Sequence, residues 1–233
     1  MPTLSVPAMS SRPATPVADA RIGADSSALP WSARLVRSVR RALRLDRERR
    51  WNSEYAAGGW DWLRNIDERA HHSVLAGYAA YLKPGGSLLD VGCGEGVFQE
   101  ELRGAAGRYV GVDFEQPIQR AQHKANATTR FVVGDMNEFV VDERFDVIVF
   151  NESIYYLHDT LAGVQRYESM LAPDGVLLIS MHGKERNDAL WTALDARYTT
   201  LDRVTITNVR DVRWTVKAMV PPGSTFRMAP QAP

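Results

Sequence analysis

The sequence predicts an α/β fold: a doubly wound, mostly parallel seven-stranded sheet with an antiparallel edge strand, helices on both faces and an N-terminal helical extension. Three observations support it. Short apolar runs alternate with helix-like segments between residues 87 and 198, which is typical of parallel strands joined by crossover helices. The first run leads directly into a glycine-rich turn. The last two runs alternate as half-buried strands do, which predicts an antiparallel pair at one edge.

The predicted core covers residues 83–222. Its strands are, in chain order, SLLDVG (87–92), RYVGVDF (108–114), RFVVGDM (130–136), FDVIVFN (145–151), GVLLISM (175–181), DRVTITN (202–208) and RWTVKAMV (213–220). Helices are predicted near 96–106, 116–126, 159–171 and 185–198. Lid or cap helices are predicted over 51–82 ahead of the core, and a flexible C-terminus over 223–233.

Charge divides the 233-residue chain, whose net charge is zero, into two parts. Residues 1–50 contain ten arginines and four acids, which leaves the remainder with an acidic excess. Residues 1–30 are rich in Pro, Ala and Ser without periodicity, which predicts a disordered tail. Residues 31–50 place apolar side chains on one half of a helical wheel and arginines on the other, which predicts a basic amphipathic helix. This helix either anchors the protein to a membrane surface or an anionic partner, or packs on the main domain or a second subunit.

A single cysteine excludes a disulfide framework and a cysteine-rich zinc site, so no metal site is predicted. No apolar run approaches the roughly 20 residues that span a bilayer, and the N-terminus lacks the pattern of a secretory signal. We therefore expect a cytoplasmic protein, with peripheral membrane contact through residues 31–50 as an open alternative. A monomer or a homodimer is expected.

The turn DVGCGEG (90–96) lies where a parallel sheet binds ligands, beyond the end of its first strand. Its glycines let the backbone approach a ligand, and the next helix offers free N–H groups to a negative charge, so a nucleotide-like ligand is expected. The dinucleotide fingerprint G-x-G-x-x-G would need glycine at position 97, where Val97 stands. A phosphate-binding loop would need a Lys-Ser or Lys-Thr pair, and none follows.

Two further features follow the turn in order: Asp113 at the end of the second strand, and GDM (134–136) at the end of the third. Together they resemble class I S-adenosylmethionine-dependent methyltransferases over residues 52–220. The resemblance implies a Rossmann-like core at 83–222, S-adenosyl-L-methionine as cofactor and S-adenosyl-L-homocysteine as product. The cofactor-binding residues that it implies are Asp90, Gly92, Gly94, Gly96, Asp113, Phe114, Asp135, Met136 and Asn151.

The roles of these residues follow partly from spacing. Asp113 comes 21 positions after Gly92, a separation at which an acid accepts hydrogen bonds from ribose hydroxyls. The resemblance places Asp135 at the exocyclic amine of adenine, the Met136 N–H at a ring nitrogen and Phe114 against the base. It places the methionine end of the cofactor among Asp90, Gly92 and Asn151. Alternatively, Asp113 and Asp135 are ordinary turn or cap acids, Asp90 organises the turn, and Cys93 packs without reacting.

The resemblance places the acceptor side around NESIYYLHD (151–159), which leaves the fourth strand. The family's D/N-P-P-Y signature for methylation of amino groups on nucleobases and glutamine is absent, because Glu152 and Ser153 stand where its prolines would be, which argues against that subclass. His158 and His182 are candidate general bases, since imidazole titrates near neutrality, although His158 could simply border a helix capped by Asp159. The candidate catalytic residues are Glu152, His158 and His182, and the candidate substrate-binding residues are Tyr55, Tyr155 and Tyr156.

Ahead of the core, Trp51, Tyr55, Trp60 and Trp62 surround the step Gly58-Gly59. Mobile glycines beside aromatic residues suit a lid that excludes water, although the same aromatic residues could pack a helix on the sheet.

The function predicted from these features is methyl transfer to a hydroxyl or amine of a small molecule, such as a sugar, a lipid-linked compound or a specialised metabolite. The alternative is a nonenzymatic partner or membrane-recruitment module that acts through residues 31–50. A nucleic-acid substrate is disfavoured, because aromatic residues do not alternate with the arginines of that segment.

Overall fold

The computed structural model describes residue 46 and residues 48–228. The predicted tail at 1–30, most of the amphipathic helix at 31–50 and the last five residues lie outside this part of the chain. Residues 48–56 are helical, and a short 3-10 helix, η2 (Asp61–Arg64), leads from them into the core.

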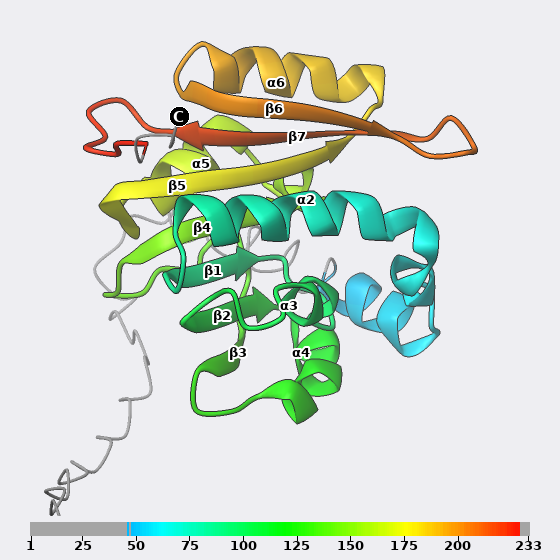
Figure 1. The fold of residues 1–233 in the computed structure, drawn as a ribbon. Helices are drawn as coiled ribbons and strands as arrows, with labels where there is room; N and C mark the ends of the chain where they lie inside the picture. Colours follow the sequence, from blue (N-terminus) through cyan, green and yellow to red (C-terminus); the bar gives the residue numbers. More distant parts are fainter. Residues whose placement is uncertain (1–45, 47, 229–233) are drawn as a thin grey trace, which may run out of the picture. The chain divides into compact units, whose positions relative to one another are not determined.

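Seven strands form one mixed sheet in the order β3-β2-β1-β4-β5-β7-β6 (Figure 1). The strands are β1 (Ser87–Val91), β2 (Arg108–Asp113), β3 (Thr129–Val133), β4 (Phe145–Asn151), β5 (Leu171–His182), β6 (Thr199–Thr207) and β7 (Arg213–Val220). The first five pair in parallel, and β7 pairs antiparallel with both β5 and β6. The predicted α/β fold, with its antiparallel edge, is confirmed.

Both faces of the sheet are buried, which explains why the strands read as unbroken apolar runs. In β4, Val147 and Val149 belong to one hydrophobic cluster and Ile148 and Phe150 to the other, because successive side chains point to opposite faces. Side chains from the helices complete each of the two hydrophobic clusters.

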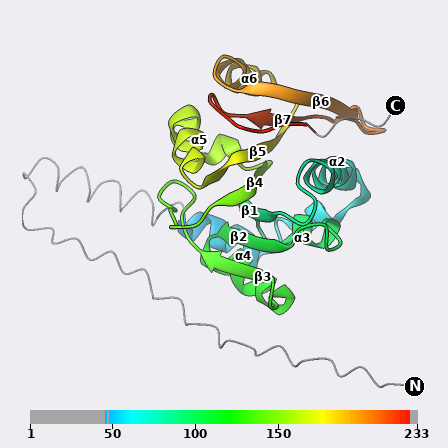
Figure 2. The same cartoon turned by 60° about the vertical axis from the view of Figure 1, so that its left-hand side comes forward.

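Figure 2 shows helices on both sides of the sheet. On one face pack α2 (Ile66–Leu82), α3 (Val97–Glu101) and α4 (Glu115–Ala121); on the other pack α5 (Thr160–Glu168) and α6 (Asp188–Asp195). Along α2, Leu75, Ala76 and Ala79 are buried against the sheet, which leaves the first turns of this helix near the ends of the strands. Short 3-10 helices lie at η3 (Gln122–Lys124), η4 (Ile154–Tyr156) and η5 (Glu185–Asn187).

The helix predicted over 96–106 is shorter than expected. It ends at Glu101, because Arg103 and Gly104 adopt left-handed backbone angles, with φ of 48° and 82°. The chain then returns to the sheet at β2.

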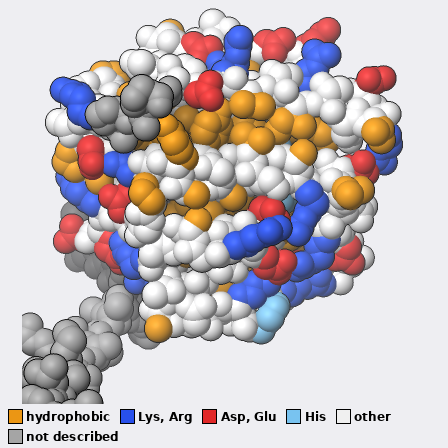
Figure 3. Space-filling view, in the orientation of Figure 1, with side chains coloured by type: hydrophobic (Ala, Val, Ile, Leu, Met, Phe, Trp, Pro, Cys, Tyr) orange, Lys and Arg blue, Asp and Glu red, His pale blue; other side chains and the backbone are white. Residues whose placement is uncertain are grey.

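Figure 3 shows hydrophobic side chains gathered in a band just above α2, on the side of the sheet that carries β7. Leu201, Ile206 and Phe226 are partly buried members of the cluster beneath this face. No helix within the described part of the chain is long and apolar enough to cross a membrane.

Candidate functional site

A cavity of about 500 Å³ opens where the strand order reverses, at the carboxyl ends of β1 and β4. Twelve of the fifteen predicted site residues line it: Tyr55, Asp90, Gly92, Gly94, Asp113, Phe114, Met136, Asn151, Glu152, Tyr155, Tyr156 and His182. The other three, Gly96, Asp135 and His158, are not among the lining residues.

The glycine-rich turn has no room for side chains at its first two glycines. At Gly92, where φ is 76°, an added Cβ would lie 2.7 Å from the Cβ of Ser153. At Gly94 it would lie 2.9 Å from the hydroxyl of Tyr55. The turn is thus pressed between the end of β4 and the segment that precedes the core.

Gly96 serves the fold beside the cavity. It is the N-cap of α3 with φ of 71°, and an added Cβ would lie 2.9 Å from the ring of Phe131. Glycine is required here by the backbone and by the neighbouring ring.

Asp113 ends β2 with both carboxylate oxygens already oriented by the backbone. The Gly94 N–H donates to Oδ2 at 2.8 Å, and the Phe114 N–H donates to Oδ1 at 2.7 Å. Burial nevertheless raises the pKa of Asp113 to about 6. Each oxygen keeps a further lone pair, so the carboxylate is positioned to accept donors from a ligand.

Asp90 is buried at the end of β1, and only one of its two carboxylate oxygens accepts a hydrogen bond from the described residues. Its Oδ2 accepts from the Tyr109 hydroxyl at 2.6 Å, while Oδ1 is buried without a donor among the described residues. Burial raises the pKa of Asp90 to about 7, helped by the nearby Asp113. Such a carboxylate would be stabilised by a cationic ligand.

We expect Asp90→Asn to stabilise the ligand-free protein at pH 8 by up to about 4 kcal/mol, at about 1.4 kcal/mol for each unit by which the pKa of Asp90 is raised. Because the pKa of Asp90 is higher in the folded protein, the folded state holds a proton that the unfolded chain has lost, and wild-type stability falls as the pH rises from about 4 to 7. The measurement is urea unfolding at pH 4.5 and pH 8, with Asp142→Asn, an exposed acid, as control. Equal destabilisation by Asp90→Asn at both pH values would contradict this expectation.

Asp135 lies buried behind the cavity, where its Oδ1 accepts from the backbone N–H and the side-chain amide of Asn137, at 2.8 and 3.0 Å. These contacts shape the turn after β3, and the turn brings Met136 and Asn137 to the cavity instead. Asn137 was not predicted, since no motif marks it. Its Oδ1 accepts a hydrogen bond from the backbone N–H of His158 at 2.8 Å.

Glu152 is the most constrained of the predicted catalytic residues. It has a left-handed backbone with φ of 56°, which non-glycine residues rarely adopt. Its Oε1 accepts from the Ser180 hydroxyl at 2.9 Å, and its Oε2 accepts from the Tyr155 hydroxyl at 3.1 Å and from the backbone N–H of His182 at 2.9 Å. Burial raises its pKa. The Ser180 hydroxyl also lies 2.9 Å from Asn151 Oδ1, so one small network holds Asn151, the last residue of β4, and Glu152, which follows it.

The two predicted histidine bases differ in position. His182 lines the cavity at the end of β5, and its pKa is lowered by burial and by Lys184 and Arg186. His158 is exposed and outside the lining, because Asp159 caps α5 by accepting from the Ala162 N–H at 3.0 Å and the histidine is carried to the surface beside it. The structure thus gives no support to His158 as a base.

Sequence reasoning missed most of the cavity wall that α2, η5 and the β6–β7 hairpin form. The residues that it missed are Glu68, Asn187, Arg210 and Trp214; His72, whose place in the pocket the sequence left open, lines the same wall. Glu68 and His72 are four positions apart and therefore share a helix face, and this face continues into the buried Leu75. That spacing was the one available signal for the two α2 residues.

Aromatic side chains from 51–62 line the cavity and contact one another. Trp51 lies 4.8 Å from Tyr156 and 5.1 Å from Trp60 between ring centroids, and Tyr55 stacks on Trp60 at 5.8 Å. These residues line the cavity together with Trp62. Whether the segment moves stays a prediction.

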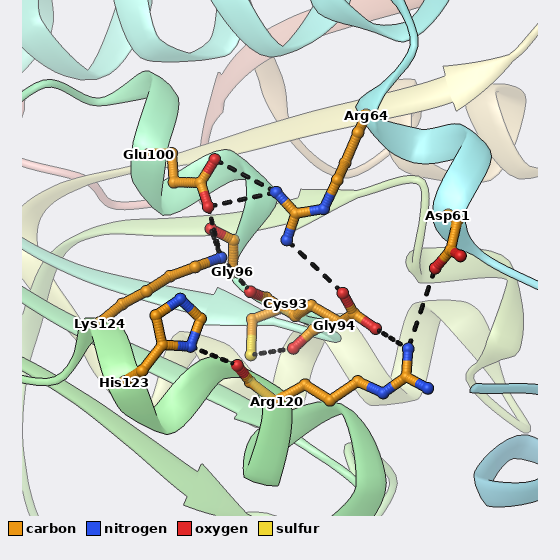
Figure 4. Close-up of polar contacts among 10 residues, drawn as sticks. Asp61, Arg64, Cys93, Gly94, Gly96, Glu100, Arg120, His123 and Lys124 are labelled. Atoms are coloured by element: carbon orange, nitrogen blue, oxygen red, sulfur yellow. Dashed lines mark hydrogen bonds and ion pairs between the residues drawn. The ribbon is translucent and has the colours of Figure 1, made fainter. Parts of the chain in front are cut away.

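An ion-pair network ties η2 to the glycine-rich turn, and in Figure 4 Arg64 and Arg120 approach the turn from opposite sides. The carboxylate of Glu95 lies 2.7 Å from Arg120 Nη1 and 3.5 Å from Arg64 Nη2. Arg64 also pairs with Glu100 at 3.3 Å, and Lys124 pairs with Glu100 at 2.6 Å. The segment that contains η2 is therefore joined to the turn by ion pairs as well as by ring contacts.

Arg64→Ala is expected to weaken binding of S-adenosylmethionine about threefold to tenfold at low salt, and by less at 0.5 M NaCl, because exposed ion pairs are each worth under about 1 kcal/mol and are screened. Calorimetric titration measures it. The matched control is Arg69→Ala: the side chains of Arg64 and Arg69 are 43% and 42% exposed, and Arg69 pairs with Glu101 away from the turn. An equal loss of affinity for S-adenosylmethionine in both variants would contradict the idea that Arg64 acts through its ion pairs with the turn.

Comparison with known proteins decides the family. A family model described as a methyltransferase domain matches residues 62–218. The chain belongs to this family. The assignment agrees with the described architecture and confirms the predicted Rossmann-like methyltransferase fold.

The methyltransferase domain is similar to nodulation protein S of Sinorhizobium fredii, with 32% identity over 122 residues, which is 50% of this chain and 56% of that protein. It is similar to the solved N-methyltransferase NodS of Bradyrhizobium japonicum in complex with S-adenosyl-L-homocysteine, with a TM-score of 0.60 and 25% identity over 70% of this chain and 91% of that chain. A 1,6-didemethyltoxoflavin-N1-methyltransferase of Burkholderia thailandensis shares the fold, with a TM-score of 0.64 and 20% identity over 77% and 88% of the two chains. The chain spans little more than half the length of the curated relatives that it matches.

Proposed function

We propose that the protein transfers a methyl group from S-adenosylmethionine to a hydroxyl or amine of a small molecule. One observation carries the proposal: the same cavity is lined by the glycine-rich turn and Asp113, which we call its cofactor end, and by Glu152, His182 and the α2 wall, which we call its acceptor end. A cofactor and an acceptor that share one cavity can meet without crossing solvent. Its volume, about 500 Å³, is typical of small-molecule sites.

The residues of the first end fit the cofactor. The Asp90 Oδ1, buried without a donor, suits the ammonium of its methionine end, and the oriented carboxylate of Asp113 suits the ribose diol. Met136, Asn137 and Phe114 would face the base. When bound, the cofactor supplies a methyl group that is electrophilic because its sulfur is positive.

The residues of the chain itself would position the acceptor and exclude water from the cavity. Asn151 and Glu152 are held by Ser180 at the switch point, where an acceptor would lie. The rings of Trp51, Trp60 and Tyr156 would exclude water. The alternative function, recruitment through residues 31–50, involves residues mostly outside the described part of the chain and stays a prediction.

The test is calorimetric titration of the purified full-length protein with S-adenosylmethionine, S-adenosylhomocysteine and NAD. Micromolar binding of the first two without binding of NAD is expected, followed by release of S-adenosylhomocysteine when an acceptor is added. Failure of a folded protein to bind either compound would reject the proposal.

A further inference from the structure

The acceptor end of the cavity contains a buried carboxylate that the protein leaves without a hydrogen bond. Glu68, in the first turn of α2, is 6% exposed and lines the cavity. No described residue donates a hydrogen bond to its carboxylate; among the described residues its ion-pair contact is with the ring of His71, whose Nδ1 lies 3.9 Å from Oε2. Burial keeps the pKa of His71 well below its usual range, so this imidazole is neutral and does not balance the acid.

Two other residues that line the cavity also have a buried polar atom without a hydrogen-bond partner among the described residues. Asn187, 2% exposed, donates its amide to the His182 carbonyl at 2.7 Å, while its Oδ1 is buried with no donor among the described residues. The Nδ1 of His72, 3% exposed, is likewise unpartnered in the described part. Both residues line the cavity. Buried acceptors of this kind are costly unless a ligand donates to them.

A second carboxylate, Glu152, shares the cavity and raises the pKa of Glu68 through its charge, after burial, which is the main cause. Two acids in one buried site select a ligand that carries positive charge and several N–H donors. A neutral alcohol has one donor and would leave the like charges unbalanced. The oxygens of Glu152 already accept three hydrogen bonds, whereas those of Glu68 accept none from the described residues.

We propose that the acceptor is a protonated amine and that Glu68 is the catalytic residue that binds its ammonium group and takes its proton. This inference rests on the proposed methyl transfer and names the acceptor class. In the step, one N–H bond of the ammonium breaks and an O–H bond forms on Glu68, which leaves a neutral carboxylic acid and an amine whose lone pair is free to attack. The ammonium must lose this proton first, because a protonated nitrogen has no lone pair to donate.

The charges around Glu68 set the pH range in which its carboxylate is ionised and can bind an ammonium group. Burial raises the pKa of Glu68 to about 7, with further raising by Glu152 and Asp67 and some lowering by Arg210, which pairs with Asp67. Below pH 7 the acid is protonated and binds an ammonium poorly. Affinity for the amine should therefore rise as the pH increases through about 7, until the amine itself deprotonates.

The experiment uses full-length protein saturated with S-adenosylhomocysteine and two probes of equal shape, phenethylamine and 2-phenylethanol, whose ring suits the aromatic lining. We expect wild type to bind the amine more tightly than the alcohol. Glu68→Gln should lose at least tenfold in amine affinity and its pH dependence, and leave alcohol binding unchanged, while Glu68→Asp should lose less. The control, Asp188→Asn, changes an exposed acid in the first turn of α6 and should behave as wild type.

Two companion readouts use the same proteins. Ligand-free Glu68→Gln should be more stable than wild type at pH 8, since it removes an unbalanced buried charge. With S-adenosylmethionine, formation of S-adenosylhomocysteine should require the amine and fall at least 100-fold in Glu68→Gln.

Several results would overturn the inference: no amine binding by wild type, equal amine affinity in Glu68→Gln, destabilisation by this substitution, or no methylation of the amine. Binding of S-adenosylmethionine is measured on the same samples. If it is retained while the amine results fail, only the acceptor assignment falls; if it is absent, the proposed function falls as well.

Discussion

Asp113→Ala is expected to weaken binding of S-adenosylmethionine by at least about 100-fold, because hydrogen bonds to a charged group contribute about 1.5–3 kcal/mol each and a ribose offers two hydroxyls. The substitution also releases the backbone N–H groups of Gly94 and Phe114 from their common acceptor. Calorimetric titration measures the change. Asp113→Asn, which keeps one oxygen, should lose less.

The matched control is Glu115→Gln, which changes an exposed acid two positions further along the chain. It should bind as wild type does. A thermal melt of each variant establishes that it is folded. Wild-type affinity in folded Asp113→Ala would remove Asp113 from the site and leave the cavity without its best ribose acceptor.

The second large effect is on stability, at Gly92. Gly92→Ala is expected to lower the free energy of unfolding by about 3 kcal/mol: a left-handed backbone costs a residue with a Cβ about 1–2 kcal/mol, and the contact with Ser153 at 2.7 Å forces neighbouring atoms to shift. For a chain of this size the melting temperature should fall by roughly 10 °C.

Two further variants separate the causes. Gly77→Ala, in the exposed part of α2, should be neutral or stabilising, since nothing lies within 4 Å of the added Cβ and alanine favours helix. Gly92→Ala should cost less in a Ser153→Gly background, where the steric contact is gone but the backbone cost remains. Equal costs in both backgrounds would show that the contact with Ser153 is unimportant.

Much of the fold could be predicted from sequence because its signals are local. Parallel strands buried on both faces produce apolar runs, and the antiparallel strand β6 produces alternation, so all seven strands were found near their observed positions. The positions of the residues that we propose to bind the cofactor could be predicted for the same reason. Gly92, Gly94 and Asp113 sit at fixed distances along one strand-turn-helix-strand unit.

The acceptor end depends on contacts between distant segments, and here the sequence was a poor guide. Glu68, Asn187 and Trp214 come from α2, η5 and β7, and nothing in their immediate neighbours indicates that they meet. His158 was predicted because its residue type suits a base, yet the cap at Asp159 turns it outward. Packing between distant segments decides which side chains reach the cavity, and the chemistry of a residue type alone does not.

The placement of the tryptophans gives the protein a built-in optical signal. The chain contains six tryptophans, and four of them, Trp51, Trp60, Trp62 and Trp214, line the cavity. Indole emission responds to the polarity of its surroundings, so intrinsic fluorescence should change when the cavity fills. Trp51 and Trp60 lie with Tyr55 beside the glycine-rich turn, whereas Trp214 stacks on His71 at 5.2 Å at the acceptor end. Variants that keep one tryptophan from each group would report cofactor and acceptor arrival as two separate signals from an unlabelled protein.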